Sequence, residues 1–232
     1  MLKIKELKES FLKHKKFFNN DKLKVILPWV EILDENIDGE KILRNLERAI
    51  RTSYQSFDKV WPDSHYKLIK LILSLKHEST LEHEKITFKV TTSRWVTHEL
   101  VRHRLASYTQ ESTRYVKYWE KNSYQIIYPV HLSSKSDDEV KKWYDIQVKI
   151  AETYGDFLSS WWQPQEARWI LTNDLKTDIV VTMNLRALRH YFNLRCDKSA
   201  HSDIRIVAWE LMYQLKDKIP LIFDDIVEKF EK

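Results

Sequence analysis

The sequence predicts an α+β protein: a single domain whose small mixed or antiparallel sheet is flanked by long helices. Segments with strand-like alternation and segments with helical spacing follow one another without a regular strand–helix–strand rhythm. The chain has 232 residues, of which 43% are hydrophobic and 31% are charged. A chain of this length and balance can fold around one sizeable core.

The first elements are separated by clear signals in the sequence. "KLKVILPWVEIL" (22–33) is typical of a strand that Pro28 interrupts or confines to a sheet edge. Residues 39–54 and 65–76 repeat apolar side chains at helical spacing, and "KITFKVTTS" (85–93) alternates like a half-buried strand.

Ser93 is a good N-cap, and from it we expect a helix to run through "RWVTHELVRHRL" to Leu105. The "SYTQESTR" that follows is interpreted as a loop. The later predicted elements are a strand at 124–129, a long helix at 137–162, a strand at 177–184, a helix at 185–194 and a helical segment at 203–230 that Pro220 breaks.

Residues 1–20 form a basic segment with six lysines. Ile4, Leu7, Phe11 and Phe18 recur in it at roughly helical spacing. We expect a basic N-terminal extension, folded as a helix on the surface of a main domain at 21–232. A helix lying on a membrane surface is the alternative.

Composition limits how the chain can bind a phosphate or a dinucleotide. Gly39 and Gly155 are the only glycines, so neither GxGxxG nor GxxxxGK[ST] is present. Side chains or helix N-termini would then have to hold such a ligand. The formal net charge of +5 suits an anionic ligand at least as well as a nucleic acid.

Other features of the sequence favour a cytoplasmic protein with no membrane partner. No apolar run approaches the roughly 18 residues of a membrane-spanning helix, and the N-terminus lacks the pattern of a signal peptide. Cys196 is the single cysteine and cannot form an internal disulfide, which fits a reducing compartment.

The stretch "VRHRLASYTQESTRYVKYWE" (101–120) is unusually rich in side-chain donors. On the predicted helix, Glu99, Arg102 and His103 would share one face. An exposed ion pair there would contribute less than about 1 kcal/mol. The hydroxyls and amide that lead to Arg114 suit a phosphate or the edge of a heterocycle.

A second cluster lies in "NLRALRHYFNLR" (184–195). Its predicted helix carries cationic side chains without an interleaved acid, so it would require a counter-anion unless the face is simply solvated. The polar face contains Arg186, Arg189, His190 and Asn193, and the apolar face contains Leu185, Leu188 and Phe192.

The segment "HESTLEH" (77–83) raises the question of a metal site. Its histidines are six residues apart, whereas the helical zinc pattern HExxH needs four. We therefore favour a capping or core-edge His77 and a surface Glu82 over a metal centre. Cys196 follows Arg195, but a buried, unreactive thiol is the favoured interpretation.

"RHRLASYTQESTRY" (102–115) resembles RHRxxSxxxxSxRY, the signature of flavin-dependent thymidylate synthases. The resemblance extends to "HESTLEH", to "EAR" at 166–168 and to "MNLRALRHYFNLR" at 183–195. It covers most of residues 40–230 and leaves residues 1–20 outside.

The resemblance implies that residues 21–232 are a catalytic domain of de novo dTMP biosynthesis. It implies the FAD-dependent reductive methylation of dUMP to dTMP, with 5,10-methylenetetrahydrofolate as the carbon donor and NADPH as the reductant. It also implies a homotetramer with shared active sites. In these sites the flavin, rather than a cysteine thiolate, would carry the methyl transfer. Nucleic acid is not an expected partner.

Positions carried over from the family divide into two sets, with no metal ligand. Arg195 is the implied catalytic residue, since a fixed guanidinium could contact the uracil edge and stabilise negative charge there. The residues implied to bind FAD are His77, Ser79, Glu82, Arg102, His103, Arg104, Gln110, Asn184, Arg186 and His190. The residues implied to bind dUMP are Glu99, Arg102, Gln110, Glu111, Ser112, Thr113, Arg114, Arg168 and Arg195.

Some relatives carry glutamine at the position of Glu99, and other residues at Thr109 and Gln110. Three other interpretations stay open. One is a nucleic-acid-binding protein, favoured by a pI of about 9.0 and by abundant aromatics. The others are a metal-dependent nucleotide hydrolase and a family member that has lost activity.

Overall fold

The computed structural model describes residues 2–119 and 124–231. The chain divides into two compact units, each made of three segments. Unit 1 comprises Met1–Trp29, Val90–Leu100 and Thr109–Ile179. Unit 2 comprises Val30–Lys89, Val101–Tyr108 and Val180–Lys232.

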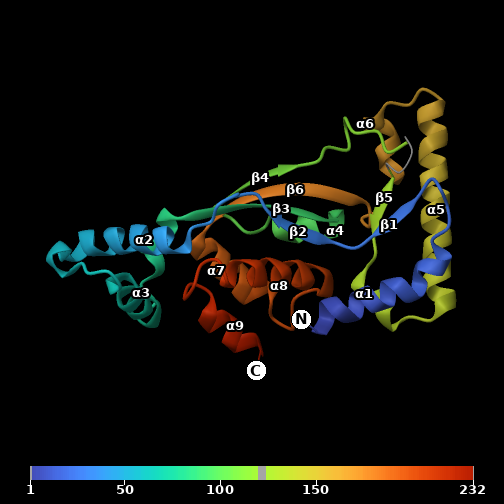
Figure 1. The fold of residues 1–232 in the computed structure, drawn as a ribbon. Helices are drawn as coiled ribbons and strands as arrows, with labels where there is room; N and C mark the ends of the chain where they lie inside the picture. Colours follow the sequence, from blue (N-terminus) through green and yellow to red (C-terminus); the bar gives the residue numbers. More distant parts are fainter. Residues whose placement is uncertain (1, 120–123, 232) are drawn as a thin grey trace. The chain divides into compact units, whose positions relative to one another are not determined.

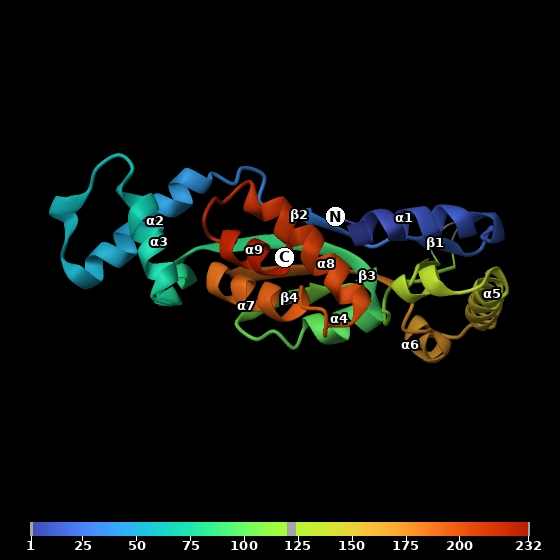
Figure 2. The ribbon, with the colours of Figure 1, turned by 90° about the horizontal axis from the view of Figure 1, so that it is seen from below.

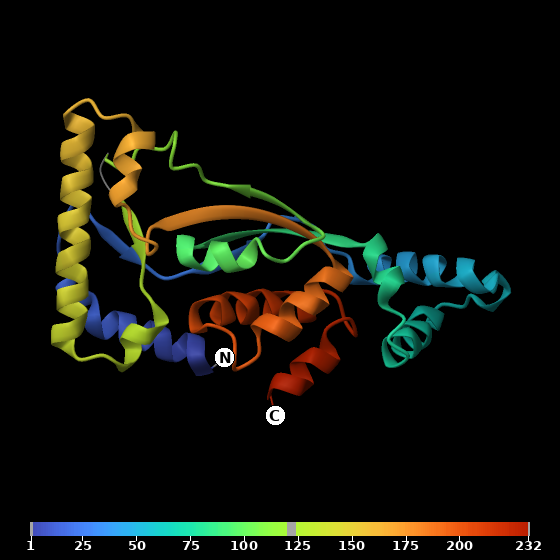
Figure 3. The same cartoon turned by 180° about the vertical axis from the view of Figure 1, so that it is seen from behind.

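Unit 1 contains a basic N-terminal helix, a two-stranded parallel sheet and a long helix (Figures 1 and 2). In the sheet, Val25 lies opposite Ile126. Figure 3 shows α6 beside one end of the long helix α5, and the two pack together. The elements are α1 (Leu2–His14), η1 (Lys15–Phe17), β1 (Lys24–Ile26), α4 (Arg94–Leu100), β5 (Gln125–Ile127), η4 (Val130–Ser134), α5 (Asp137–Ser159), α6 (Pro164–Ala167) and η5 (Arg168–Ile170).

Aromatic side chains form much of the core of unit 1. The rings of Tyr124 and Tyr154 are buried with their centroids 6.0 Å apart. Ser136 begins α5 with a capping box that includes Glu139. Gly155 leaves room on α5 for the Trp119 ring, since a Cβ at this position would collide with it.

Unit 2 is mainly helical. Figure 1 shows α2 and α3 side by side, and α7 packs against η3, α8 and α9. Leu43, Leu46, Phe192 and Phe223 are fully buried in its core. The elements are α2 (Gly39–Tyr54), η2 (Phe57–Lys59), α3 (Ser64–Ser74), η3 (Glu78–His83), α7 (Leu185–Arg195), α8 (Ser202–Lys216) and α9 (Asp224–Glu231).

A four-stranded sheet has the order β2-β3-β6-β4. β3 and β6 run antiparallel, because Thr87 bonds to Thr182 (3.0 Å) while Thr91 bonds to Asp178 (2.5 Å). Side chains of β6 alternate between buried and half-buried, as they do in a strand with one covered face. The strands are β2 (Trp29–Ile32), β3 (Lys85–Ser93), β4 (Ala106–Gln110) and β6 (Lys176–Asn184), and the unit boundary falls within each of them.

The predicted α+β class, with small sheets flanked by helices, is confirmed. Pro28 separates β1 from β2, which belong to different sheets. The helix expected within residues 1–20 is α1, whereas the division into an extension at 1–20 and a domain at 21–232 stays a prediction. No helix of the described residues is long and apolar enough to span a membrane.

The predicted course of residues 94–110 is wrong in two respects. The helix that starts at Arg94 ends at Leu100 rather than Leu105, and "ASYTQ" is the strand β4 rather than a loop. Leu105 turns the chain between them with a left-handed φ of 64°. Pairing of β4 at the edge of the sheet overrides the local helical preference. Glu99, Arg102 and His103 therefore do not share a helical face.

Candidate functional site

Most of the predicted site residues fall in two polar clusters, one in each unit. The first, which we call the substrate cluster, contains Gln110–Arg114 and Arg168 in unit 1. The Gln110 side chain donates to Thr97 Oγ1 (3.0 Å) and to Thr177 Oγ1 (3.2 Å), which fixes the end of β4. The chain then turns, and Ser112 Oγ accepts from the Arg114 N–H (3.3 Å).

Two guanidinium groups belong to the substrate cluster. Arg168 Nη1 donates to Thr113 Oγ1 (3.4 Å), so it reaches the turn from a segment 55 residues away. Arg114 is exposed and lies over the Tyr115 ring, 5.6 Å from its centroid. No carboxylate of the described residues pairs with Arg114 or Arg168. Unpaired guanidinium groups next to hydroxyls suit a phosphate or a similar anion.

Glu111 has a different environment from its neighbours in the cluster. Its carboxylate accepts from Tyr118 Oη (2.6 Å), from Lys176 Nζ (2.9 Å) and from the Asp178 N–H (3.3 Å). Burial opposes the charged form of Lys176, yet the hydrogen bonds to Asp178 and Glu111 raise its pKa. Burial, together with the hydrogen bond to Glu111, raises the pKa of Tyr118. The Glu111 carboxylate thus holds the turn to β6, and its role toward dUMP stays a prediction.

The strand residues that hold this turn were missed by sequence reasoning. The predicted strand at 177–184 contains Asp178 but not Lys176, which bonds to Asp178 (2.6 Å). The signal available was the pair of charges two apart in "KTD", which places both on one face of a strand. Glu99, also predicted to bind substrate, lies partly buried in the last turn of α4.

The second cluster, which we call the flavin cluster after its predicted ligand, lies in unit 2. His103 is only 7% exposed, and its Nε2 accepts from Arg195 Nε at 2.9 Å. Burial, followed by the positive charge of Arg195 and by His190, lowers the pKa of His103 to about 4. The imidazole is therefore neutral near pH 7 and able to accept this bond. Arg102 and Arg104 flank it and are exposed.

α7 positions the remaining residues of the flavin cluster. Asn184 caps the helix, since its Oδ1 accepts from the Ala187 N–H (2.8 Å). Two residues further on, Arg186 donates to Glu82 of η3 (2.5 Å). His190 is exposed, and its ring centroid lies 6.2 Å from that of His103.

The structure brings together two subsets of the predicted flavin-binding residues. One is Glu82 with Arg186, and the other is His103 with His190. Arg195, which is predicted to be catalytic and to bind dUMP, joins the second subset through its bond to His103. His77 precedes η3 and Ser79 lies within it, both exposed. Gln110, predicted to contact both ligands, belongs to unit 1 with the substrate cluster.

The interpretation of "NLRALRHYFNLR" as a face of unpaired cations is wrong. Arg189 is buried, and it donates to Glu78 (2.9 Å), to both oxygens of Asp225 (2.7 Å each) and to the Ile222 carbonyl. Arg186 pairs with Glu82. The acids come from η3 and α9, so their pairing was invisible in the local sequence.

The environment of Cys196 argues against a nucleophilic thiolate. The residue is buried, and burial raises the pKa of its thiol to about 12. The expected burial of Cys196 is confirmed, and its lack of reactivity stays a prediction. Among the described residues, no group of three or more His, Cys, Asp or Glu side chains could hold a metal ion.

An α+β fold with two arginine-rich clusters defines a class of protein suited to anionic ligands. The family described as "Thymidylate synthase complementing protein" matches residues 34–221. A flavin-dependent thymidylate synthase of Pyrococcus furiosus is 39% identical over 165 residues, covering 70% of this chain and 67% of the relative. One of Saccharolobus solfataricus is 33% identical over 198 residues, covering 84% and 75%.

A solved structure supports the fold. The UMP/dUMP methylase PolB of Streptomyces cacaoi, bound with 5-Br dUMP, superposes with a TM-score of 0.72 over 89% of this chain and 97% of that one. Its sequence identity is 22%, so this likeness concerns the fold alone. With the sequence matches, the chain belongs to the flavin-dependent thymidylate synthase family.

Proposed function

We propose that this protein is a flavin-dependent thymidylate synthase that methylates dUMP to dTMP. The observation that carries the proposal is the substrate cluster. Arg168 bonds there to Thr113, the neighbouring Arg114 lies over Tyr115, and neither arginine has a carboxylate partner among the described residues. Two guanidinium groups and a hydroxyl are the donors that a nucleotide phosphate requires. Family membership supports the identity of the nucleotide.

The cofactor in this proposal is FAD, and the residues present fit it. The exposed Arg102, Arg104 and Arg186 offer cationic donors for a pyrophosphate, and the neutral His103 and the exposed His190 offer ring nitrogens for a flavin edge. When bound, the reduced flavin supplies the hydride. NADPH would reduce it, and 5,10-methylenetetrahydrofolate would provide the carbon.

Arg195 is the proposed catalytic residue. Its guanidinium donates through Nε to His103, which fixes one edge of the planar group. A guanidinium held in this way could contact the uracil edge and stabilise the negative charge that develops there. A neutral His103 can do this positioning, whereas a protonated imidazole would repel the guanidinium.

We further propose that the protein is a cytoplasmic homotetramer with shared active sites. Each chain would consist of a basic extension at 1–20 and a catalytic domain at 21–232. Large exposed side chains support association: in unit 1, Trp161 is 90% exposed and Trp169 is 84% exposed. The start of the family match at residue 34 is consistent with an N-terminal extension.

The test is the formation of dTMP by the purified protein, with FAD, dUMP, methylenetetrahydrofolate and NADPH, monitored with the flavin absorbance. We expect a bound flavin whose oxidation depends on dUMP, and dTMP as the product. A protein that binds no flavin, even with FAD in excess, would refute the proposal. Bound flavin without product would identify a family member that has lost activity, with Glu99 as the first residue to exchange for Gln.

A further inference from the structure

An open groove lies in unit 1 between the N-terminal helix and β1. Its volume is about 620 Å³, which falls in the roughly 300–1,000 Å³ range of small-molecule sites. All of its lining residues lie between Phe11 and Trp29, before the family match begins at residue 34. None of them is in the substrate or flavin cluster, so the groove is not explained by the proposed reaction.

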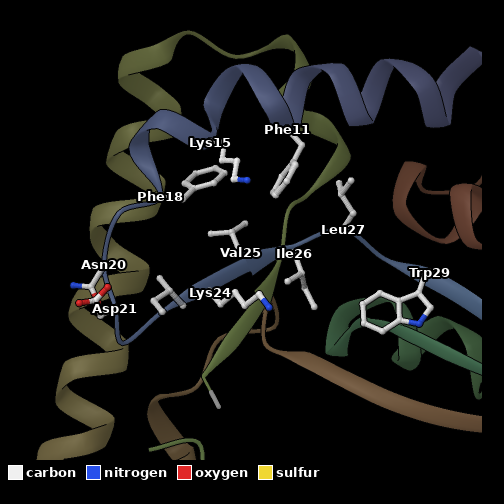
Figure 4. A pocket seen from close by; sticks show the side chains of 11 residues that line it. Phe11, Lys15, Phe18, Asn20, Asp21, Lys24, Val25, Ile26, Leu27 and Trp29 are labelled. Atoms are coloured by element: carbon white, nitrogen blue, oxygen red, sulfur yellow. The ribbon is translucent and has the colours of Figure 1, made fainter. Parts of the chain in front are cut away.

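The walls of the groove are aromatic and apolar. Figure 4 shows Phe11 and Phe18 on the helical side, with Val25 and Leu27 pointing toward them from β1 and the segment after it. Trp29 lies at one end and is 45% exposed. Aromatic rings with accessible surface offer stacking partners for another flat ring.

Contacts within unit 1 hold both walls in place. The Phe18 ring lies 5.1 Å from Tyr144 and 5.9 Å from Phe11, measured between centroids. The Tyr144 hydroxyl accepts from the Asn20 N–H (2.9 Å), which anchors the turn at the other end of the groove. On the opposite wall, β1 is paired with β5. A ligand would therefore meet a preformed site.

The charged groups of the groove favour an anion. Lys15 and Lys24 line it, against the single carboxylate of Asp21. Neighbouring Lys13 and Lys16 are both paired with Asp137, at 3.1 Å and 2.7 Å. In the part of the chain that the structure describes, no carboxylate pairs with Lys15 or Lys24. The two ammonium groups are thus available to a ligand phosphate or carboxylate.

We propose that this groove binds a small aromatic anion. A flat ring system would stack on Phe11, Phe18 or Trp29, while its phosphate or carboxylate would contact Lys15 and Lys24. Nucleoside phosphates and folates both have this chemistry. The proposal does not depend on dUMP methylation, because the groove shares no residue with the two clusters.

The test is calorimetric titration of the full chain and its variants with ATP and, separately, with 5-formyltetrahydrofolate. We expect at least one of them to bind, and the Lys15→Ala/Lys24→Ala variant to bind it at least tenfold more weakly. Lys5→Ala/Lys8→Ala is the matched control, since it removes two exposed lysines from α1 outside the groove. Its affinity should stay within about twofold of wild type.

Two further variants separate this site from the proposed active site. Arg114→Ala/Arg186→Ala should keep the binding that Lys15→Ala/Lys24→Ala loses. Trp29→Ala should weaken the binding of ATP but leave the binding of inorganic tripolyphosphate unchanged, because only ATP has a ring that can stack on Trp29. Tighter binding of ATP would assign the groove to nucleoside phosphates, and tighter binding of formyltetrahydrofolate would assign it to folates.

Three results would overturn the proposal. One is that wild type binds neither ligand. Another is an equal loss of affinity in Lys15→Ala/Lys24→Ala and in Lys5→Ala/Lys8→Ala, which would indicate non-specific electrostatic attraction. The third is loss in Arg114→Ala/Arg186→Ala alone, which would place the ligand in the active site. Circular dichroism checks that each variant is folded.

Discussion

At the scale of single residues, His103 and Arg195 form the most informative pair of unit 2. The imidazole is buried and accepts from the guanidinium at 2.9 Å, and its pKa is lowered to about 4 by burial, Arg195 and His190. Above about pH 5 the ring is neutral and the pair is intact. Catalytic orientation of Arg195 should therefore not depend on pH in the neutral range.

Removing the guanidinium in Arg195→Ala should raise the pKa of His103 above about 4, because one positive neighbour is lost. The pKa should remain below 6.5, since burial is the largest cause and stays. An NMR titration of the histidine ring protons measures this. A wild-type His103 that titrates at 6.5 or above would contradict the buried, neutral imidazole.

The same lowered pKa has a consequence for stability. The unfolded His103 takes up a proton near pH 6.5, whereas the folded one takes it up only near pH 4. Between these values the unfolded state binds more protons, so this residue makes the free energy of unfolding fall as the pH drops from 6.5 toward 4. The loss should level off below about pH 4.

Glu111→Gln should destabilise the protein by about 1–3 kcal/mol, because it removes the charge that the buried Tyr118 and the half-buried Lys176 share. Tyr118 and Lys176 would each keep a weaker, neutral acceptor or lose it. Urea unfolding measures the change in the free energy of unfolding. Asp145→Asn is the control, because its pair with Lys141 is exposed and worth less than about 1 kcal/mol. Equal effects of the two substitutions would refute the structural role of Glu111.

At the scale of elements, most helices and strands could be predicted from the sequence. The helix at 39–54 has both the predicted bounds and a cap at Asp38, and Pro28 and Pro220 both interrupt regular structure as expected. Periodicity and end signals are local, so they can be read from one segment. Strand β4 could not be predicted, because its conformation depends on pairing with a distant strand.

The candidate site likewise has residues that could be predicted from the sequence and contacts that could not. The motif identified Arg114, Arg168 and the cationic groups around His103, since these are residue types at fixed spacing. It could not show that Glu111 bonds to Lys176, or that Arg189 is paired with Glu78 and Asp225. Those partners come from other elements, and a single sequence carries no record of which elements meet.

Arg189→Met tests the element-level role of that buried cation, which ties α7 to η3 and α9 within unit 2. We expect a loss of about 1–3 kcal/mol in the free energy of unfolding, since several charged hydrogen bonds disappear. Arg186→Ala, on the same helix but exposed, should change stability by less than about 1 kcal/mol while weakening FAD binding. Reversed effects on stability would contradict the different burial of the two arginines.

At the scale of the whole molecule, the predicted ligand sets follow the two units. Residues predicted to bind dUMP lie mostly in unit 1, and those predicted to bind FAD lie mostly in unit 2. Each unit therefore contains its own set of arginine side chains that we propose to meet an anionic ligand. The formal net charge of +5 agrees with two anionic ligands, but it does not distinguish them from a nucleic acid.

The most direct test of the central claim is the affinity of wild type and Arg114→Ala for dUMP and for deoxyuridine, measured by calorimetry. Wild type should bind dUMP more tightly than deoxyuridine. Arg114→Ala should lose about 1.5–3 kcal/mol of binding free energy for dUMP alone, which lowers its affinity for dUMP by a factor of about 10–100. Arg48→Ala, which removes an exposed arginine from α2, should bind both ligands like wild type. Unchanged dUMP affinity in Arg114→Ala, or equal loss for deoxyuridine, would contradict the assignment of the phosphate to the substrate cluster.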